Sequence, residues 1–312
     1  MPDTAGDPFV HEALLYTGAA DYLAATVPFV VDGLAAGEPV LVAVPGPNLD
    51  LLRDALGCDA ARIRLVDMAQ AGRNPGRIIG SVLTAFADEH PGRRVRVIGE
   101  PIWAGRSATE YVACVQHEAL INVAFAGRAG TILCPYDTRR LQPTAVIDST
   151  RTHPVLVHGT HRVASPEYRD PLQVVATVDR PLPYPGPECD VDVMVVATGA
   201  RDARRFVHER AVREGMAAER ISELRRAVHE AVTNTLVHAG GRGLLSVWIA
   251  DGHLVCEVQD GGRVTDPLAG RRAPEPFDGR GRGLFLVNLL CDLVRVHWSG
   301  AGSTIRMYKL LA

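Results

Sequence analysis

The chain has 312 residues and a mass of 33.5 kDa, enough for two ordinary domains, and 47% hydrophobic with 22% charged residues is the balance of a globular protein with buried cores. A net charge of −3 argues against nucleic acid or an anionic lipid surface as the main partner. No apolar run is long enough to span a membrane and the first ten residues lack the pattern of an export signal, so we expect a cytoplasmic protein.

Two residue types restrict the chemistry further. The six cysteines are scattered, with no Cys-x-x-Cys pair and no His/Cys clustering, which predicts reduced core thiols. Lysine occurs once, at Lys309, so no glycine-rich loop of this chain ends in a phosphate-binding lysine.

Up to about residue 160, short apolar runs alternate with amphipathic segments. Four apolar runs are typical of buried strands: residues 39–45, 62–68, 94–102 and 130–137. Four amphipathic segments are typical of helices: residues 19–37, 48–57, 76–90 and 107–127. This alternation predicts a mostly parallel sheet with helices on its faces, in a doubly wound three-layer α/β domain.

Residues 163–190 contain six prolines and no sustained periodicity, which indicates a connector. We therefore expect one domain over residues 1–162 and a second over residues 191–312. The second domain contains two predicted helices, two strands joined by a turn at Asp251-Gly252, a glycine-rich loop, a further helix and a last strand. The helices are expected at residues 199–215, 218–240 and 281–296, and the strands within 243–260 and at 302–311. This order predicts an α+β sandwich, with helices on one face of a mixed sheet.

The second helix of this domain carries three polar side chains one turn apart, Glu230, Asn234 and His238. The opposite side of the helix is apolar: Leu224, Val228, Ala231, Val232 and Thr235. Such a polar line is often no more than a solvated helix face, and His238 near a helix end is more often a packing or capping residue than a catalytic one.

Three glycine-containing stretches follow the helix. In residues 259–266, Asp260 at a strand end can accept a hydrogen bond from an exocyclic amine, and the next two glycines let a ring approach the backbone. In residues 277–290, Gly279, Gly281 and Gly283 precede a helix whose exposed N–H groups form an anion site. Residues 300–307 add Gly-Ser-Thr on the last strand. Each stretch alone could be an ordinary turn.

Four motifs occur in this order: Glu-x-x-x-Asn, Asp-Gly-Gly, Gly-x-Gly-x-Gly-Leu and Gly-Ser-Thr. Together they resemble the ATP-binding (GHKL or Bergerat) fold, which is shared by gyrase, heat-shock chaperones, sensor histidine kinases and mismatch-repair proteins. The resemblance covers residues 191–312 and implies ATP and Mg²⁺ as cofactors. It implies that Asn234 holds the metal, which prefers oxygen ligands, and that Glu230 is the general base. The other residues implied at the nucleotide are Asp260, Gly262 and Thr304 for adenine and Gly281, Arg282, Gly283 and Leu284 for the phosphates. Val264 departs from the family's pattern, which has glycine there.

Within this superfamily the domain resembles bacterial anti-sigma factors that are also serine kinases. The resemblance implies a regulator of transcription in stress response that binds a sigma factor and phosphorylates a serine of a STAS-type anti-anti-sigma partner, with Glu230 deprotonating that serine. Related kinases are often homodimers. Two alternatives stay open: a nucleotide-dependent clamp that sequesters its partner without phosphorylating it, and a nucleotide-free adaptor, which the departure at Val264 leaves open. Autophosphorylation at His229 is disfavoured because no long two-helix dimerisation segment precedes it.

The first half resembles the MEDS sensory domain, similar to the RecA-type fold, over residues 8–160. The stretches that carry the resemblance begin at His11, at His117 ("HEALINVAF") and at Cys134 ("CPYD"). The loop after the first predicted strand, "VPGPNLDLLRDAL", has no Gly-Lys-Ser/Thr, so this half has no P-loop and is not expected to hydrolyse nucleotide.

Six polar residues of the first half fall at predicted strand ends and helix starts, where open α/β sheets bind ligands. These candidates for a small-molecule or redox site are His11, Glu118, Asn122, Cys134, Tyr136 and Asp137. Structural roles are the alternative, with Asp137 as a helix N-cap and Cys134 as a core thiol. A metal site is not predicted, because the histidines and Cys134 share no ligand spacing.

Overall fold

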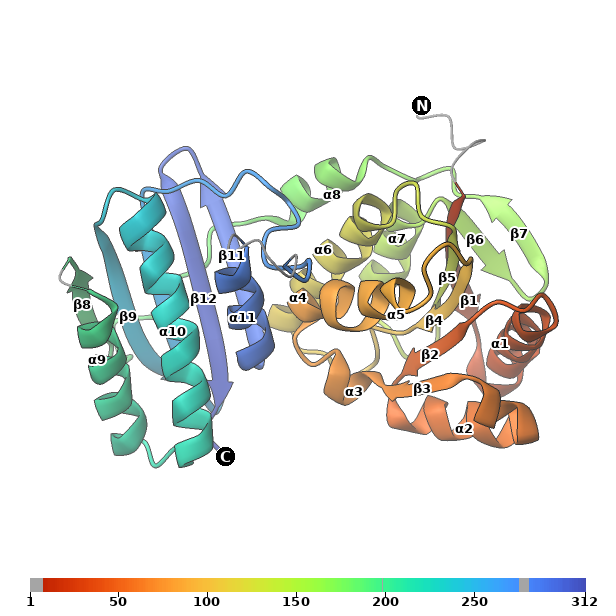
Figure 1. The fold of residues 1–312 in the computed structure, drawn as a ribbon, viewed down its shortest axis with the longest axis horizontal. Helices are drawn as coiled ribbons and strands as arrows, with labels where there is room; N and C mark the ends of the chain where they lie inside the picture. The colour runs from red at the N-terminus through yellow and green to blue at the C-terminus, as the bar shows by residue number, and fades with distance from the viewer. Residues whose placement is uncertain (1–7, 198, 275–280) are drawn as a thin grey trace. The chain divides into compact units, whose positions relative to one another are not determined.

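The computed structural model describes residues 8–197, 199–274 and 281–312 (Figure 1). The chain divides into two compact units, Met1–Val178 and Asp179–Ala312. The division falls inside the proline-rich segment, which also contains helix α8 (Pro171–Val178). Among the described residues, no helix combines the length and the hydropathy needed to cross a membrane.

The first unit is built on a seven-stranded sheet in the order β3-β2-β4-β5-β1-β6-β7. Its strands are β1 (Phe9–Tyr16), β2 (Val40–Val44), β3 (Arg64–Asp67), β4 (Val95–Gly99), β5 (Gly130–Asp137), β6 (Val155–His158) and β7 (His161–Ala164). All neighbours are parallel except β6 and β7. The helices are α1 (Gly18–Ala35), α2 (Gly46–Leu56), η2 (Gly57–Arg62), α3 (Met68–Ala71), α4 (Pro75–Ile78), η3 (Ile79–Leu83), α5 (Thr84–Asp88), α6 (Ala108–Ala124) and α7 (Pro143–Thr152).

Strand β2 is buried along its whole length because helices cover both faces of this sheet. Val40, Val42 and Val44 pack into a core cluster with apolar side chains of α1 and α2. Since side chains alternate along a strand, Leu41 and Ala43 face the other layer, and both are fully buried. The predicted doubly wound three-layer domain is confirmed.

The sequence prediction missed three strands of this sheet, β1, β6 and β7, and helix α7 among the shorter helices. Strand β1 lies inside the sheet, between β5 and β6. Its sequence contains His11 and Glu12, which are both buried, so it does not read as an apolar run. The helix predicted over residues 76–90 is present, but a π-helical turn, η3, interrupts it.

The second unit has a five-stranded sheet in the order β11-β12-β10-β9-β8, with helices on one face (Figure 1). Its strands are β8 (Asp192–Val196), β9 (Gly243–Ala250), β10 (His253–Asp260), β11 (Leu293–Ser299) and β12 (Gly302–Leu310), and its helices are α9 (Ala200–Arg213), α10 (Ala218–His238) and α11 (Arg282–Leu290). The predicted sandwich is confirmed. The prediction of a mixed sheet is wrong, because all four strand pairs are antiparallel.

The turn between β9 and β10 is the one that the sequence predicts. Asp251 and Gly252 have φ angles of 47° and 72°, as the two central residues of a type I′ turn require. The turn pairs Ala250 with His253 and sets the register of the hairpin.

Helix α11 is shorter than predicted, because it ends at Leu290 and β11 starts at Leu293. The link between them is fastened to β12: Lys309 Nζ donates to the Leu290 carbonyl (2.7 Å) and the Leu310 amide donates to Asp292 (2.8 Å). These bonds satisfy the end of the helix, and the β-branched residues that follow pair with β12.

The outer face of this sheet holds a buried ion pair that gives a stability prediction. Glu257 on β10 and Arg306 on β12 lie directly opposite each other, are 1% and 5% exposed, and are hydrogen-bonded. Arg306 also donates to the Pro183 carbonyl (3.0 Å) in the segment that follows Asp179. Arg306→Met leaves a buried carboxylate without its cation, so it should lower the free energy of unfolding by about 3–5 kcal/mol in urea denaturation.

The double variant Glu257→Gln/Arg306→Met removes the unpaired charge and should recover part of this loss. A double variant that is no more stable than Arg306→Met would contradict the assignment of the loss to the orphaned carboxylate.

Candidate functional site

A pocket of about 270 Å³ opens in the second unit between the C-terminal half of α10, the end of β10 and the start of α11. Six of the residues predicted to hold a nucleotide line it: Asn234, Asp260, Gly262, Gly281, Gly283 and Leu284. The exposed His238 at the end of α10 and Val264 line it as well. Segments that are far apart in the sequence therefore meet around one space.

Three hydrogen bonds hold the Asp260 carboxylate in one orientation. Oδ1 accepts from the Gly262 amide (2.9 Å) and the Ser303 hydroxyl (2.7 Å), and Oδ2 accepts from the Thr235 hydroxyl (2.6 Å). An ionised carboxylate has about four acceptor positions. One position on Oδ2 is thus left to accept a hydrogen bond from an amine in the pocket.

Gly262 keeps space free beside this carboxylate. A Cβ at this position would stand 3.0 Å from Ala239 Cβ and 3.1 Å from Asp260 Oδ1, so a side chain would have to displace one of them. The sequence assigns Gly262 to the approach of a planar base, and the geometry is compatible with that role.

Helix α11 begins directly over the polar side chains of α10. Its N-cap, Gly281, has a φ of 80°, which favours glycine. A Cβ on Gly283 would lie 3.2 Å from both terminal atoms of the Asn234 amide and 3.2 Å from Glu230 Oε2. The first amides of a helix lack intrahelical acceptors and mark its positive end, so an anion-binding terminus faces Asn234.

Three predicted residues do not line the pocket. Glu230 is half-buried behind Gly283, and Arg282 is exposed at the first position of α11. Thr304, predicted at the adenine, lies on the other face of the sheet, because Ser303 and Ile305 on either side of it line the pocket and side chains alternate along β12.

Two residues that contact Asp260 were missed in the sequence. Ser303 is paired with Asp260 across the β10–β12 ladder, a register that could not be read before the strands were paired. Thr235 belongs to the apolar stripe of α10 and was assigned to the core, where it is fully buried.

The loop between β10 and α11 is anchored at Gly270. Gly270 has a φ of 73°, and a Cβ there would stand 2.7 Å from Leu284 Cβ. Asn288 Nδ2 donates to the Gly270 carbonyl (3.0 Å), which ties the loop to α11. Val264, the departure from the family pattern, therefore lies between the end of β10 and this anchor at Gly270.

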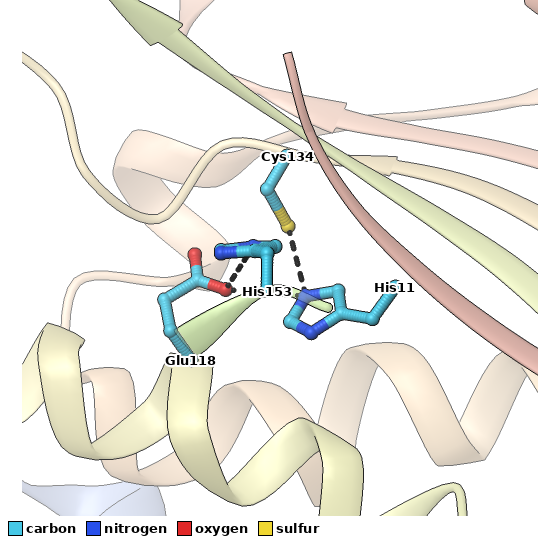
Figure 2. Close-up of side chains that lie close together, drawn as sticks. All are labelled: His11, Glu118, Cys134 and His153. Carbon is cyan, nitrogen blue, oxygen red and sulfur yellow. Dashed lines mark hydrogen bonds and ion pairs between the residues drawn. The ribbon is translucent and has the colours of Figure 1, made fainter. Parts of the chain in front are cut away.

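In the first unit, five of the six sensory candidates gather in one buried place. His11, Glu118 and Cys134 meet His153, a residue that the sequence analysis did not single out (Figure 2). Asn122 and Tyr136 adjoin them, through a contact to His11 Nδ1 (3.2 Å) and an edge contact to the ring of His153.

Burial sets the ionisation of this cluster. It lowers the pKa of His11 from 6.5 to about 4, helped by the nearby His153, so the His11 ring is neutral at pH 7. Burial also raises the pKa of the Cys134 thiol well above its usual value.

Asp137, the sixth candidate, lies at a different site. It is not a helix N-cap: its carboxylate accepts from the Arg139 amide (3.0 Å) in a turn, and α7 starts after Gln142. With Tyr16, Asn48 and Glu100 it lines a pocket of about 240 Å³ at the carboxyl ends of β1, β2, β4 and β5. This is the sheet edge at which open α/β folds bind ligands.

Glu100 gives this edge pocket an unusual acid group. Asn48 Nδ2 donates to Glu100 Oε2 (2.7 Å), and burial raises the pKa of Glu100 from 4.5 to about 8. At pH 7 the carboxyl group is therefore mostly protonated and can donate as well as accept a hydrogen bond.

The shifted pKa predicts how stability depends on pH. The folded chain keeps a proton on Glu100 that the unfolded chain releases above about pH 4.5, so this contribution to stability is lost as the pH rises through about 8. This lowers the free energy of unfolding by about 1 kcal/mol per pH unit, a slope that is seen from about pH 6.5 to pH 8, where His11 is neutral in both states and no longer opposes it. Glu100→Gln should remove that slope in denaturant titrations, and the exposed Glu89→Gln should keep it; equal slopes in wild type and Glu100→Gln would refute the assignment.

Comparisons with known proteins agree with the two units. The first unit is an α/β domain with a pocket at the carboxyl ends of its strands. The second unit is a two-layer sandwich with a pocket at the N-terminus of a helix. Residues 10–154 match the MEDS family, described as the methanogen/methylotroph DcmR sensory domain, and residues 197–309 match the histidine kinase-like ATPase domain. The chain thus joins a MEDS domain to a histidine kinase-like ATPase domain.

No curated protein matches the sequence. Among solved structures, the RsbU and RsbW domains of Rv1364c from Mycobacterium tuberculosis are 18% identical over 38% of this chain, with a TM-score of 0.30. The chain spans 32% of the length of that structure.

Proposed function

We propose that the second unit binds Mg²⁺-ATP in the pocket between α10, β10 and α11. The chain is then a regulator of transcription that binds a sigma factor and phosphorylates a serine of a STAS-type anti-anti-sigma partner, under control of its MEDS domain. The observation that carries this proposal is the convergence of Asn234, Asp260 and the start of α11 around one pocket, in a domain that matches the histidine kinase-like ATPase family.

The donor atoms present suit a magnesium nucleotide. Asn234 Oδ1 lies 3.2 Å from the position of a Cβ on Gly283, so an oxygen ligand for Mg²⁺ faces the N-terminus of α11. Glu230 Oε2, the proposed base, lies at the same distance from that position. Asp260 accepts a hydrogen bond from the amine of adenine, and the first amides of α11 bind phosphate oxygens. Bound Mg²⁺ would supply neutralisation of the phosphate charge.

In the proposed reaction, the partner's serine oxygen bonds to the γ-phosphorus while the bond from that phosphorus to the leaving ADP oxygen breaks. Glu230 takes the proton that the serine hydroxyl loses. This role for Glu230 depends on its carboxylate lying beside Asn234, one helical turn away on α10.

A phosphotransfer assay with Mg²⁺-ATP and a cognate STAS-type protein tests the kinase. Wild type should phosphorylate a serine of the partner, and Glu230→Gln should lower the rate at least about 100-fold while nucleotide binding stays intact. Glu219→Gln, exposed in the first turn of the same helix, is the matched control and should keep full activity.

The clamp is the second candidate, and one observation favours it: Glu230 is not part of the pocket wall. If wild type binds ATP but transfers no phosphate to any STAS-type partner, the clamp replaces the kinase. If it binds no nucleotide, the adaptor replaces both.

For the MEDS domain we propose that a small molecule binds in the edge pocket. Its protonated Glu100, Asn48 and the Tyr16 hydroxyl suit a neutral polar ligand that both donates and accepts hydrogen bonds. Trp103 lines the same pocket, so its fluorescence should report binding when a panel of small alcohols and amides is titrated into the protein. A response that survives Glu100→Ala but disappears in His11→Ala would place the ligand at the buried cluster instead.

A further inference from the structure

Four buried side chains from four different elements converge in the first unit. His11 comes from β1, Glu118 from α6, Cys134 from β5 and His153 from the end of α7, and each is at most 1% exposed. One nitrogen, oxygen or sulfur atom from each lies within 4.8 Å of the others. Figure 2 shows that the four side chains point toward one another. Such a cluster needs an explanation, because buried polar groups are costly unless they are paired.

Hydrogen bonds outside the cluster determine which nitrogen of each histidine carries a proton. Asn122 Nδ2 donates to the Thr152 carbonyl (2.9 Å), which turns its Oδ1 toward His11 Nδ1 (3.2 Å). His153 Nδ1 lies 2.9 Å from the Ser149 carbonyl. Both oxygens can only accept, so each Nδ1 carries the proton. In a neutral ring that is protonated at Nδ1, Nε2 presents its lone pair to the centre of the cluster.

Those lone pairs face a carboxylate. Glu118 Oε2 lies 3.4 Å from His11 Nε2 and 3.3 Å from His153 Nε2, whereas a charge-assisted hydrogen bond is about 2.7–2.9 Å long. Within the described part of the chain, no donor meets either oxygen of Glu118 with good hydrogen-bond geometry, and His153 Nε2 has no well-formed hydrogen bond either. Lone pairs and a buried anion facing one another without a cation between them repel.

The separations between these atoms are those of ligands around a metal ion. A tetrahedral ion with bonds of about 2.0–2.1 Å keeps its ligand atoms about 3.3–3.4 Å apart. The two Glu118 contacts have this length, and Cys134 Sγ lies 3.4 Å from His11 Nε2. We propose that His11, Glu118, Cys134 and His153 bind a divalent transition-metal ion, with Zn²⁺ the best match to this ligand set.

Charge balance supports the assignment. One carboxylate and one thiolate neutralise the two charges of the ion, and the imidazoles are neutral, so the filled site buries no net charge. Cys134 releases its proton to solvent when the ion binds. The contacts of Asn122 and Ser149 to the two Nδ1 atoms orient the rings, as outer contacts do at metal sites.

The sequence did not predict this site because its ligands share no element. Metal motifs are recognised by ligand spacing along one helix or loop, and here each ligand sits on a separate element. His117, next to Glu118 in the sequence, is not part of the cluster.

Metal analysis of the full chain tests the proposal. After dialysis against Zn²⁺ and then metal-free buffer, mass spectrometry of the folded protein should find close to one Zn²⁺ per chain. With Co²⁺, the absorption spectrum should show a thiolate-to-cobalt charge-transfer band and the intense visible bands of four-coordinate Co²⁺. A folded wild type that retains no stoichiometric Zn²⁺ and gives no such bands overturns the proposal.

Matched variants assign the ligands. Cys134→Ser should lose the charge-transfer band, and His153→Gln should weaken Co²⁺ binding at least about tenfold. The controls Cys114→Ser and His117→Gln change buried residues of α6 outside the cluster and should behave as wild type. Metal retained with an unchanged spectrum in both cluster variants overturns the proposal. If a cluster variant does not fold, the wild-type metal content and Co²⁺ spectrum decide the question alone.

Discussion

Replacing Asp260 by asparagine is expected to weaken the binding of Mg²⁺-ATP by about 10- to 100-fold. A hydrogen bond to a charged group contributes about 1.5–3 kcal/mol, and asparagine turns an N–H group either toward the adenine amine or toward one of the donors that hold Asp260. Isothermal titration calorimetry measures the change directly.

The control for this variant is Asp251→Asn. Asp251 lies in the β9–β10 turn with a φ of 47°, which asparagine adopts readily, and it does not line the pocket. It should bind ATP as wild type does. An Asp260→Asn protein whose ATP affinity stays within about threefold of wild type would show that Asp260 does not contact the nucleotide.

Gly283→Val is expected to abolish the stabilisation of the protein by nucleotide. Even the Cβ would stand 3.2 Å from Asn234 and from Glu230 Oε2, so a branched side chain must push these groups away from the start of α11. At 100 times the dissociation constant, Mg²⁺-ATP should stabilise wild type by about 2.7 kcal/mol, and the variant by almost nothing.

Equilibrium unfolding with and without Mg²⁺-ATP measures this difference. Gly300→Val is the matched control, because a Cβ there would meet open space and Gly300 does not line the pocket. Nucleotide should stabilise the control as it does wild type. Full stabilisation of Gly283→Val would mean that the phosphates bind elsewhere.

The fold could be predicted where polarity and secondary structure agree. The apolar run of β2 predicts a buried strand, and Asp251-Gly252 predicts a tight hairpin turn. Both predictions are confirmed. Strand β1 was missed because His11 and Glu12 interrupt its apolar pattern, although both are buried. The end of α11 was missed because its tertiary contacts to Lys309 and Leu310 stop it at Leu290.

The two candidate sites differ in what the sequence could reveal. The pocket residues of the second unit lie in short patterns of fixed order, so Asn234 and Asp260 could be singled out without a structure. Ser303 could not, because its contact to Asp260 depends on strand register. His153 could not either, because it joins the buried cluster only when α7 packs beside β1.

Calorimetric titration of the full chain with Mg²⁺-ATP and with Mg²⁺-GTP tests the central claim most directly. The account predicts one ATP site per chain and much weaker binding of GTP, because guanine presents a carbonyl oxygen to the Asp260 carboxylate where adenine presents an amine. Equal affinities for the two nucleotides, or no heat with either, would contradict it.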